Sequence, residues 1–343
     1  MIREMKVSYE LVWLLQRLIR RKVGLAKIIN VSVSINQVKL DTLVVSNSLR
    51  EKQVLRNYKQ PLNAPSKIIQ LSSPVLNPKT GVLWIKKQIL EESSIWPVSK
   101  LLKWEPTPFF YQKVNNISIN LPDNGYYHFV IEDFPRFFEV FKNKQFDQVI
   151  VGSKSKYILD TLNFLHIKNF IFKKYPVCCD TLVFSEKNFG GIFTKFDHSE
   201  LLSFSSKIKS TISNQILFID RKNKQKGYLE RGLKYADLIA NKFKNFNTTR
   251  VYLEDFSLIE QISLFKSSKL VIGFHGAGLA NMVWIDRTVK IIEITENRIT
   301  SHFEHIASVC EHEYTRLKAS ELAEYNAAQI SRLLDSCKYY DLK

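Results

Sequence analysis

The second half of the chain alternates strictly between short apolar segments and longer segments with helical spacing, and this alternation limits the fold more than any other feature. The apolar segments are typical of strands and lie at 215–220, 250–253, 269–273 and 289–294. Segments with helical spacing lie at 232–243, 257–268, 301–310 and 320–337. Strands that alternate with helices form a parallel sheet with helices on both faces. Residues from about 200 to 320 are therefore expected to form one doubly wound α/β domain.

The length of the chain indicates a second domain. At 343 residues it exceeds the size at which single hydrophobic cores stop growing, about 250–300 residues. Further strands are expected at 148–152, 170–173 and 181–186, with helices over 154–165 and 196–210, the latter capped by an Asp or a Ser. We expect a basic N-terminal helix over 1–30, a first domain over 31–198 and a second domain over 199–343. The last helix could pack back on the first domain.

A glycine-containing loop follows one predicted strand and leads into a predicted helix over "LANMVW", in "VIGFHGAGLANMVW" (271–284). In doubly wound sheets, ligands bind beyond the carboxyl ends of the strands. Basic side chains and backbone N–H groups there suit phosphates, and a carboxylate suits ribose hydroxyls. The residues expected at this edge are Arg221, His275, Gly276, Ala277, Gly278 and Glu293. Close packing of helix on sheet explains such glycines equally well.

The chain is strongly basic, with 50 Lys and Arg against 33 Asp and Glu, a formal net charge of +17. This balance favours phosphorylated, acidic or membrane-surface partners, although solvated surface lysines explain it without a partner. A nucleic-acid-binding protein is the alternative class, because basic side chains contact phosphates and aromatic rings stack on bases. The dispersed lysines and the lack of a helix-turn-helix, zinc-finger or RRM signature argue against it.

The N-terminal residues 1–30 predict a basic amphipathic helix. Leucines at helical spacing share this segment with a cluster of Lys and Arg, a pattern suited to an anionic membrane surface. Packing on the chain's own domain or on a partner protein is the alternative. No secretory signal or spanning segment is visible, and the four cysteines form no CxxC pair, so we expect a cytoplasmic protein, peripheral on the inner membrane face.

Two segments resemble glycosyltransferase family 61. The first is "SLIEQISLFKSSKLVIGFHGAGLANMVW…VKIIEI" with the upstream "ILFIDRK", and the second is "YYHFVIEDFPRFFEV" (126–140). The resemblance is specific from about 215 to 295 and over 126–140. The family often carries Arg-x-x-Asn-Glu after the "DRK" strand, whereas this chain has Arg231 without the Asn-Glu pair.

This resemblance implies a GT-B architecture of two Rossmann-like domains facing a cleft, with 31–198 as the acceptor-side domain and 199–343 as the nucleotide-sugar-binding domain. It also implies an inverting transferase that uses a nucleotide-sugar donor. A UDP-sugar is expected, with a CMP-sugar or another activated sugar as the alternative. The family and the composition together suggest capsule or lipopolysaccharide synthesis in bacteria, with a glycan or lipid-linked glycan as acceptor. The HGAGL-N motif adds Leu279 and Asn281 to the donor site. No cofactor and no essential metal are expected, since Arg221 and the loop N–H groups can carry the negative charge.

The second segment supplies candidates for the base that inversion requires. Glu132 is the first candidate, Asp133 the second and His128 the third. His128 and Glu132 are four residues apart and share a face on a helix. Pro135 is expected to close the turn that follows. The alternative is that these side chains pack, with Glu132 paired to Arg136.

The remaining candidates border the site. Ser301 and His302 follow the Glu293 strand and are expected near the nucleotide. His302, His305, Cys310 and His312 form a compact group, but their spacing matches no common zinc pattern, so we expect no metal site there.

Overall fold

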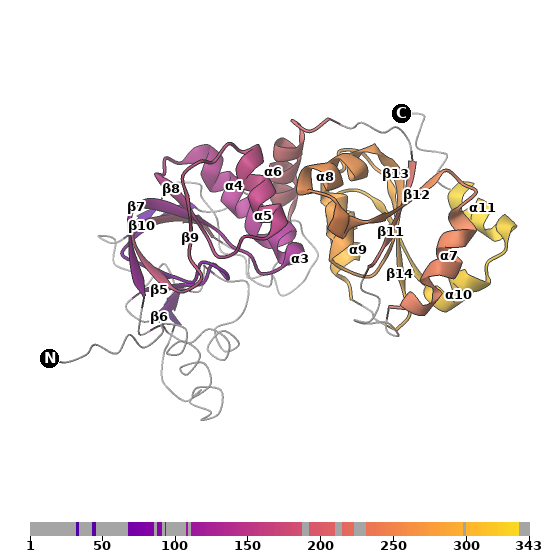
Figure 1. Cartoon of the computed structure of the whole chain (residues 1–343), viewed down its shortest axis with the longest axis horizontal. Helices are drawn as coiled ribbons and strands as arrows, with labels where there is room; N and C mark the ends of the chain where they lie inside the picture. The colour runs from indigo at the N-terminus through magenta and orange to yellow at the C-terminus, as the bar shows by residue number, and fades with distance from the viewer. Residues whose placement is uncertain are drawn as a thin grey trace, which may run out of the picture. The chain divides into compact units, whose positions relative to one another are not determined.

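The structure is a computed structural model, and it divides the chain into two compact units (Figure 1). It describes residues 32–33, 43–45, 68–85, 88–90, 93, 108, 111–186, 192–209, 215–222, 231–297 and 300–335. Unit 1 comprises the described residues up to Ile192, and unit 2 those from Phe193 onward. The basic helix predicted over 1–30 lies outside the described residues.

The sheet of unit 2 is entirely parallel among its described strands. They are β11 (Gln215–Asp220), β12 (Thr248–Tyr252), β13 (Ser268–Phe274), β14 (Lys290–Thr295) and β15 (Glu313–Lys318). Their spatial order is β12-β11-β13-β14-β15, and each pair of neighbours is parallel. From β11 the chain continues to β12 on one side of the sheet, and from β13 it continues to β14 on the other side. The topological switch point of the sheet therefore lies between β11 and β13. Ligands of doubly wound sheets bind at such a point.

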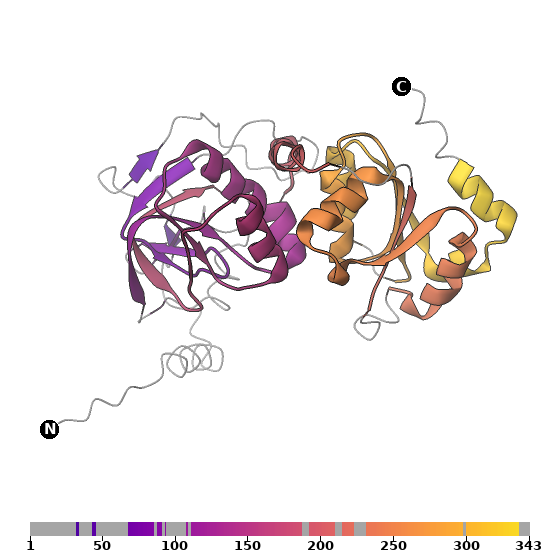
Figure 2. The same cartoon turned by 45° about the horizontal axis from the view of Figure 1, so that its top comes forward.

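Helices cover both faces of this sheet, as predicted from the alternation. They are α6 (Lys195–Ser205), η6 (Leu233–Tyr235), α7 (Ala236–Phe243), η7 (Leu253–Asp255), α8 (Leu258–Ser267), η8 (Ala277–Trp284), α9 (His302–Val309), α10 (Ala319–Glu324) and α11 (Ala327–Asp335). Figures 1 and 2 show α7, α10 and α11 on one face and α8 and α9 on the other. Because both faces are covered, the central strands are continuous apolar runs.

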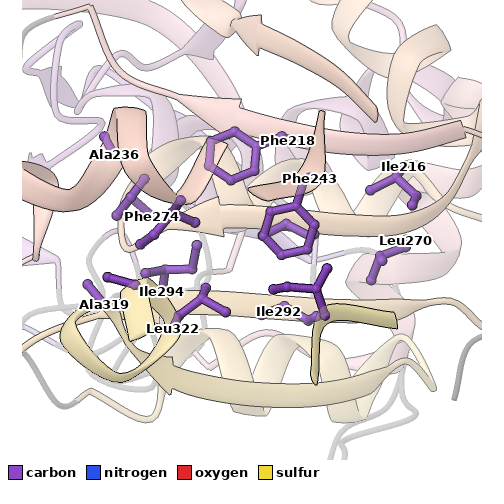
Figure 3. Close-up of a cluster of buried hydrophobic side chains, with 14 of the residues drawn as sticks. Ile216, Phe218, Ala236, Phe243, Leu270, Phe274, Ile292, Ile294, Ala319 and Leu322 are labelled. Carbon is purple, nitrogen blue, oxygen red and sulfur yellow. The ribbon is translucent and has the colours of Figure 1, made fainter. Parts of the chain in front are cut away.

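Aromatic and branched side chains fill the space between the sheet and the helices α7, α10 and α11 that cover one of its faces (Figure 3). Phe218 of β11 and Phe274 of β13 lie edge to face with ring centroids 6.1 Å apart, and both side chains are buried. Phe243 of α7 and Leu322 of α10 join the same cluster. The C-terminal helices therefore pack on unit 2 itself, which corrects the suggestion that the last helix packs on the other domain.

Three details of unit 2 differ from the sequence predictions. The helix over 320–337 is instead two short helices, α10 and α11, preceded by the unpredicted strand β15. The helix after the glycine loop is the 3-10 helix η8. Helix α6 is capped by Thr194, not by an Asp or Ser, in a capping box with Asp197. Because α6 begins at this cap, the predicted boundary at 199 falls inside a helix, and the division lies before Phe193.

Unit 1 contains a mixed sheet. Its strands are β1 (Ser32–Val33), β2 (Leu43–Val45), β3 (Ile68–Ser72), β4 (Val75–Leu76), β5 (Leu83–Ile85), β6 (Gln88–Leu90), β7 (Gln112–Leu121), β8 (Gln148–Val151), β9 (Phe170–Phe172) and β10 (Val177–Ser185). The order β10-β7-β8-β9 is parallel, whereas β3 and β4 pair antiparallel with β10. Only the parallel half therefore follows the expected Rossmann-like pattern.

The helices of unit 1 connect the parallel strands. Between β7 and β8 the chain forms α3 (Tyr126–His128), η4 (Phe129–Asp133) and α4 (Phe134–Asn143), and α5 (Lys156–Phe164) connects β8 to β9. The η4 stretch is a π-helix, in which the Phe134 N–H donates to the Phe129 carbonyl. Pro135 does not close the turn as predicted. It lies in the first turn of α4, where its missing N–H is tolerated, and the helix continues.

Candidate active site

The loops after β11 and β13 bring Arg221 and the glycine loop together at the switch point of unit 2. Arg221 follows β11 directly, and His275 and Gly276 follow β13, the strand beside it. A Cβ atom at Gly276 would lie 2.7 Å from Cζ and 3.0 Å from Nε of Arg221. The guanidinium therefore lies against the glycine backbone, and only a residue without a side chain leaves it this space.

His275 is held by a carboxylate on the next strand. Its Nδ1 lies 2.5 Å from Oε1 of Glu293 on β14, and its backbone N–H donates to the Ile294 carbonyl at 2.8 Å. The Phe303 ring packs edge to face against the imidazole with centroids 5.3 Å apart. With the hydrogen on Nδ1 directed to Glu293, the ring orientation is fixed and Nε2 becomes the nitrogen that can meet a ligand.

Glu293 is fully buried, and its second oxygen is used as well. Oε2 accepts from Nε of Arg316 at 2.8 Å and from the Tyr314 hydroxyl, both on β15. Burial alone raises the pKa of this carboxyl, but the hydrogen bonds from His275, Tyr314 and Arg316 hold its pKa below the usual 4.5. Its predicted contact with ribose is therefore replaced by an orienting role toward His275.

This network predicts a pH-dependent contribution to stability. Because the pKa of Glu293 is lowered on folding, its contribution is present above pH 4.5 and is lost as the pH falls through the lower folded value. Glu293→Gln should lower the free energy of unfolding by about 1–3 kcal/mol near pH 7 and by progressively less toward about pH 3. Urea unfolding at several pH values measures this difference. A difference that stays constant with pH would contradict the network's role, and Glu313→Gln, at an exposed position of β15, serves as the control substitution.

Two other predicted donor residues lie beneath the glycine loop. Leu279 and Asn281 are fully buried. The Asn281 amide donates to Gln261 Oε1 and to the Gly278 carbonyl, both at 3.1 Å, and its oxygen accepts from Trp284 Nε1 at 2.9 Å. These bonds shape the loop from below, so Leu279 and Asn281 support the loop.

The remaining candidates of unit 2 are Ser301, His302 and Arg231. Ser301 and His302 are exposed at the start of α9, directly after the loop that follows β14. Arg231 precedes Gly232, whose φ of 71° places it in the left-handed region that favours glycine. Residues 223–230 before it are outside the described part of the chain.

The His and Cys residues near the C-terminus do not converge on one point. His305 Nε2 lies 2.8 Å from the Phe193 carbonyl, and His312 Nε2 lies 3.0 Å from the Met282 carbonyl. Burial raises the pKa of the Cys310 thiol. Within the described residues, no group of three or more His, Cys, Asp or Glu is placed to hold a metal ion.

A second His–Glu pair lies in unit 1, on the helical segment after β7. His128 Nδ1 lies 2.8 Å from Glu132 Oε2, which confirms that the two side chains share a face. The side chain of His128 is 35% exposed and that of Glu132 only 8%. The more accessible imidazole is thus oriented by the less accessible carboxylate. The π-helical turn Phe129–Asp133 lies at this pair, and such turns are frequent at functional sites.

The other predicted residues of this segment point into unit 1. Asp133 is buried and accepts from the Asn124 amide at 3.4 Å. Arg136 is also buried, and its Nη1 lies 4.0 Å from Oε2 of Glu139 on the same helix. Asp133 is therefore better placed to hold the helix than to meet a substrate.

Sequence reasoning missed Asp123, which fixes the loop between β7 and this helix. Its carboxylate accepts from the Ser153 and Tyr157 hydroxyls, and from the Gly125 N–H at 3.2 Å. Burial opposes ionisation, but these hydrogen bonds lower its pKa. The turn-forming "PDNG" after a strand was the available signal.

Unit 2 is thus a doubly wound α/β domain with an arginine, a carboxylate-held histidine and a glycine loop at its switch point, the class of domain that binds phosphorylated ligands. A family model described as "Glycosyltransferase 61" matches residues 126–292, which include the His128–Glu132 helix and the glycine loop. The chain thus carries a glycosyltransferase 61 domain over these residues and is a glycosyltransferase, as the resemblance implied.

No curated protein matches the chain. Among solved structures, E. coli heptosyltransferase WaaC with ADP is similar at a TM-score of 0.26 and 9% identity, over 58% of this chain and 75% of that one. At these values, neither its fold nor its ligand is carried over to this chain. None of the described helices is long and apolar enough to cross a membrane.

Proposed function

We propose that this glycosyltransferase transfers a sugar, with inversion, from a nucleoside diphosphate sugar to a hydroxyl of a glycan acceptor. The observation that carries the donor half is the Arg221 guanidinium lying against Gly276 at the β11/β13 switch point, beside the Glu293-held His275. Charge-assisted hydrogen bonds from such groups are the usual means of binding a diphosphate.

On the donor side, the diphosphate lies against the glycine loop. Arg221, the backbone N–H groups of the loop and His275 Nε2 supply the donors for its oxygens. As the bond between the anomeric carbon and the phosphate oxygen breaks, the leaving diphosphate gains charge, and these preorganised groups stabilise it. We propose that they do so without an essential metal.

On the acceptor side, His128 is the base. With the Nδ1 hydrogen directed to Glu132, Nε2 takes the proton of the acceptor hydroxyl while its oxygen attacks the anomeric carbon. The carboxylate of Glu132 then stabilises the imidazolium that forms. The sequence makes Glu132 the first candidate base. In this proposal Glu132 instead orients His128, because its Oε2 contacts the imidazole.

The arrangement we propose is GT-B, in which unit 2 binds the donor and unit 1 presents the base. Both sites follow the carboxyl ends of parallel strands, which supports this division of roles. A UDP-sugar as donor and bacterial surface polysaccharide synthesis on the cytoplasmic face of the membrane complete the proposal.

A thermal-shift screen tests the donor assignment. The full chain is heated with UDP, GDP or CMP, with the corresponding nucleosides and inorganic phosphate as controls. The matching nucleoside diphosphate, at about 100 times its Kd, should stabilise the protein by about 2.7 kcal/mol and raise its Tm by a few degrees. Nucleosides should have little effect, because they lack the group that Arg221 binds. A screen in which no nucleoside diphosphate raises Tm, or in which CMP alone does, would contradict this assignment.

A further inference from the structure

Strand β9 of unit 1 presents an unusual outward face. It is the last strand in the sheet order and pairs with β8 among the described strands. Ile171 packs on the core, whereas Phe170 and Phe172, on the opposite side of the strand, are 36% and 42% exposed. Alternate residues of a strand share a face, so the two rings lie side by side on the surface. Figure 1 labels this strand in unit 1.

Lysines flank the two phenylalanines in the sequence, and another lysine contacts one of the rings. Lys154 Nζ lies 5.5 Å from the centre of the Phe172 ring, and its side chain is exposed. Lys173 Nζ, directly after β9, donates to Gln112 Oε1 at 3.0 Å. Gln112 is the first residue of β7, and Tyr111, which precedes it, is 44% exposed. The residues that make up this β9 surface are Tyr111, Lys154, Lys168, Phe170, Phe172, Lys173 and Lys174.

The sequence on either side of β9 is free of acidic residues. From Thr161 to Cys179 it contains no Asp or Glu. Lysines on an edge strand also prevent pairing with another chain's strand, which argues against strand addition as the use of this edge. A single exposed apolar side chain needs no explanation, but aromatic rings set among lysines have the composition of a membrane-interface site.

We propose that the β9 surface binds the interface of an anionic bilayer, with Phe170 and Phe172 inserted at the level of the headgroups and the lysines against lipid phosphates. The surface is separate in sequence from residues 1–30. It does not depend on the donor assignment, and it would hold the transferase beside a lipid-linked acceptor.

Vesicle co-sedimentation of the full chain tests this proposal. Vesicles of phosphatidylcholine alone are compared with vesicles containing about one third phosphatidylglycerol. Phe170→Ser with Phe172→Ser, and separately Lys154→Gln with Lys168→Gln, should each weaken binding to the anionic vesicles about tenfold or more. Leu238→Ser is the matched control, because Leu238 on α7 of unit 2 is 50% exposed and lies outside the surface. All variants keep residues 1–30, so a loss is due to β9.

A second measurement locates the strand directly. The fluorescence that the variant Phe172→Trp gains over wild type should be quenched by lipids brominated near the headgroup end of the chain. Binding that is equal in wild type and both double variants, together with no quenching of this added fluorescence, would overturn the proposal. Loss of binding to a single-stranded RNA in the double variants, with vesicle binding unchanged, would assign the surface to nucleic acid and overturn it as well.

Discussion

Replacing His128 by alanine should lower turnover by about 10²–10⁴-fold while donor affinity is retained, because a base contributes about this much to a transfer step. Glu132→Gln should cost less, about 10–100-fold, since glutamine can still accept the Nδ1 hydrogen but no longer stabilises the imidazolium. Asp133→Asn, at a buried position beside Asn124, should affect stability more than rate. Steady-state kinetics with a separate measurement of donor affinity distinguishes these effects.

A control and a pH profile make the His128 result specific. His166→Asn removes an exposed histidine of the same unit at a left-handed position, φ 55°, that asparagine tolerates, so its turnover should equal wild type. The acidic limb of the kcat/KM profile should persist in Glu132→Gln and disappear in His128→Ala. If His128→Ala turns over like wild type and Glu132→Gln loses about 10²–10⁴-fold, the carboxylate is the base and the histidine is not.

Replacing Gly276 by alanine should weaken binding of the nucleoside diphosphate about 10–100-fold. The new Cβ would overlap the guanidinium of Arg221 and displace it, and one charge-assisted hydrogen bond is worth about 1.5–3 kcal/mol. Isothermal titration of wild type and variant measures the change. Arg221→Ala should reproduce it without altering the loop.

Gly278→Ala is the matched control for this substitution. Its Cβ would lie 2.8 Å from Leu253 Cδ1 and 3.4 Å from Ile219, so it disturbs packing beneath the loop and does not touch Arg221. It should lower the free energy of unfolding by about 1–3 kcal/mol with a smaller effect on nucleotide affinity. Unchanged affinity in Gly276→Ala would mean that the diphosphate does not lie against Arg221.

The sequence predicts the strands of unit 2 well, because buried parallel strands are continuous apolar runs between recognisable helices. It does not predict β15, whose "EYTRLK" has few apolar residues and becomes a strand only by pairing with β14. Tyr314 and Arg316 were missed for that reason. Unit 1 was harder still, since its antiparallel strands are short and their pairing joins residues distant in sequence.

The candidate site shows a similar limit. Strand ends placed Arg221, His275 and Glu293 correctly at one edge of the sheet, because the carboxyl ends of parallel strands share an edge. The pattern could not tell which of them faces a ligand and which supports a neighbour. Burial gives Glu293 and Asn281 supporting positions, and the greater exposure of His128 relative to Glu132 supports our proposal that His128 is the base.

A crystal of the full chain soaked with the nucleotide sugar that the thermal screen selects tests the central claim most directly. The account predicts diphosphate density at the β11/β13 switch point, with its oxygens within hydrogen-bond distance of the Arg221 guanidinium and the His275 Nε2. Density for the nucleotide at the carboxyl edge of the unit 1 sheet, or at any position away from Arg221 and His275, would contradict it.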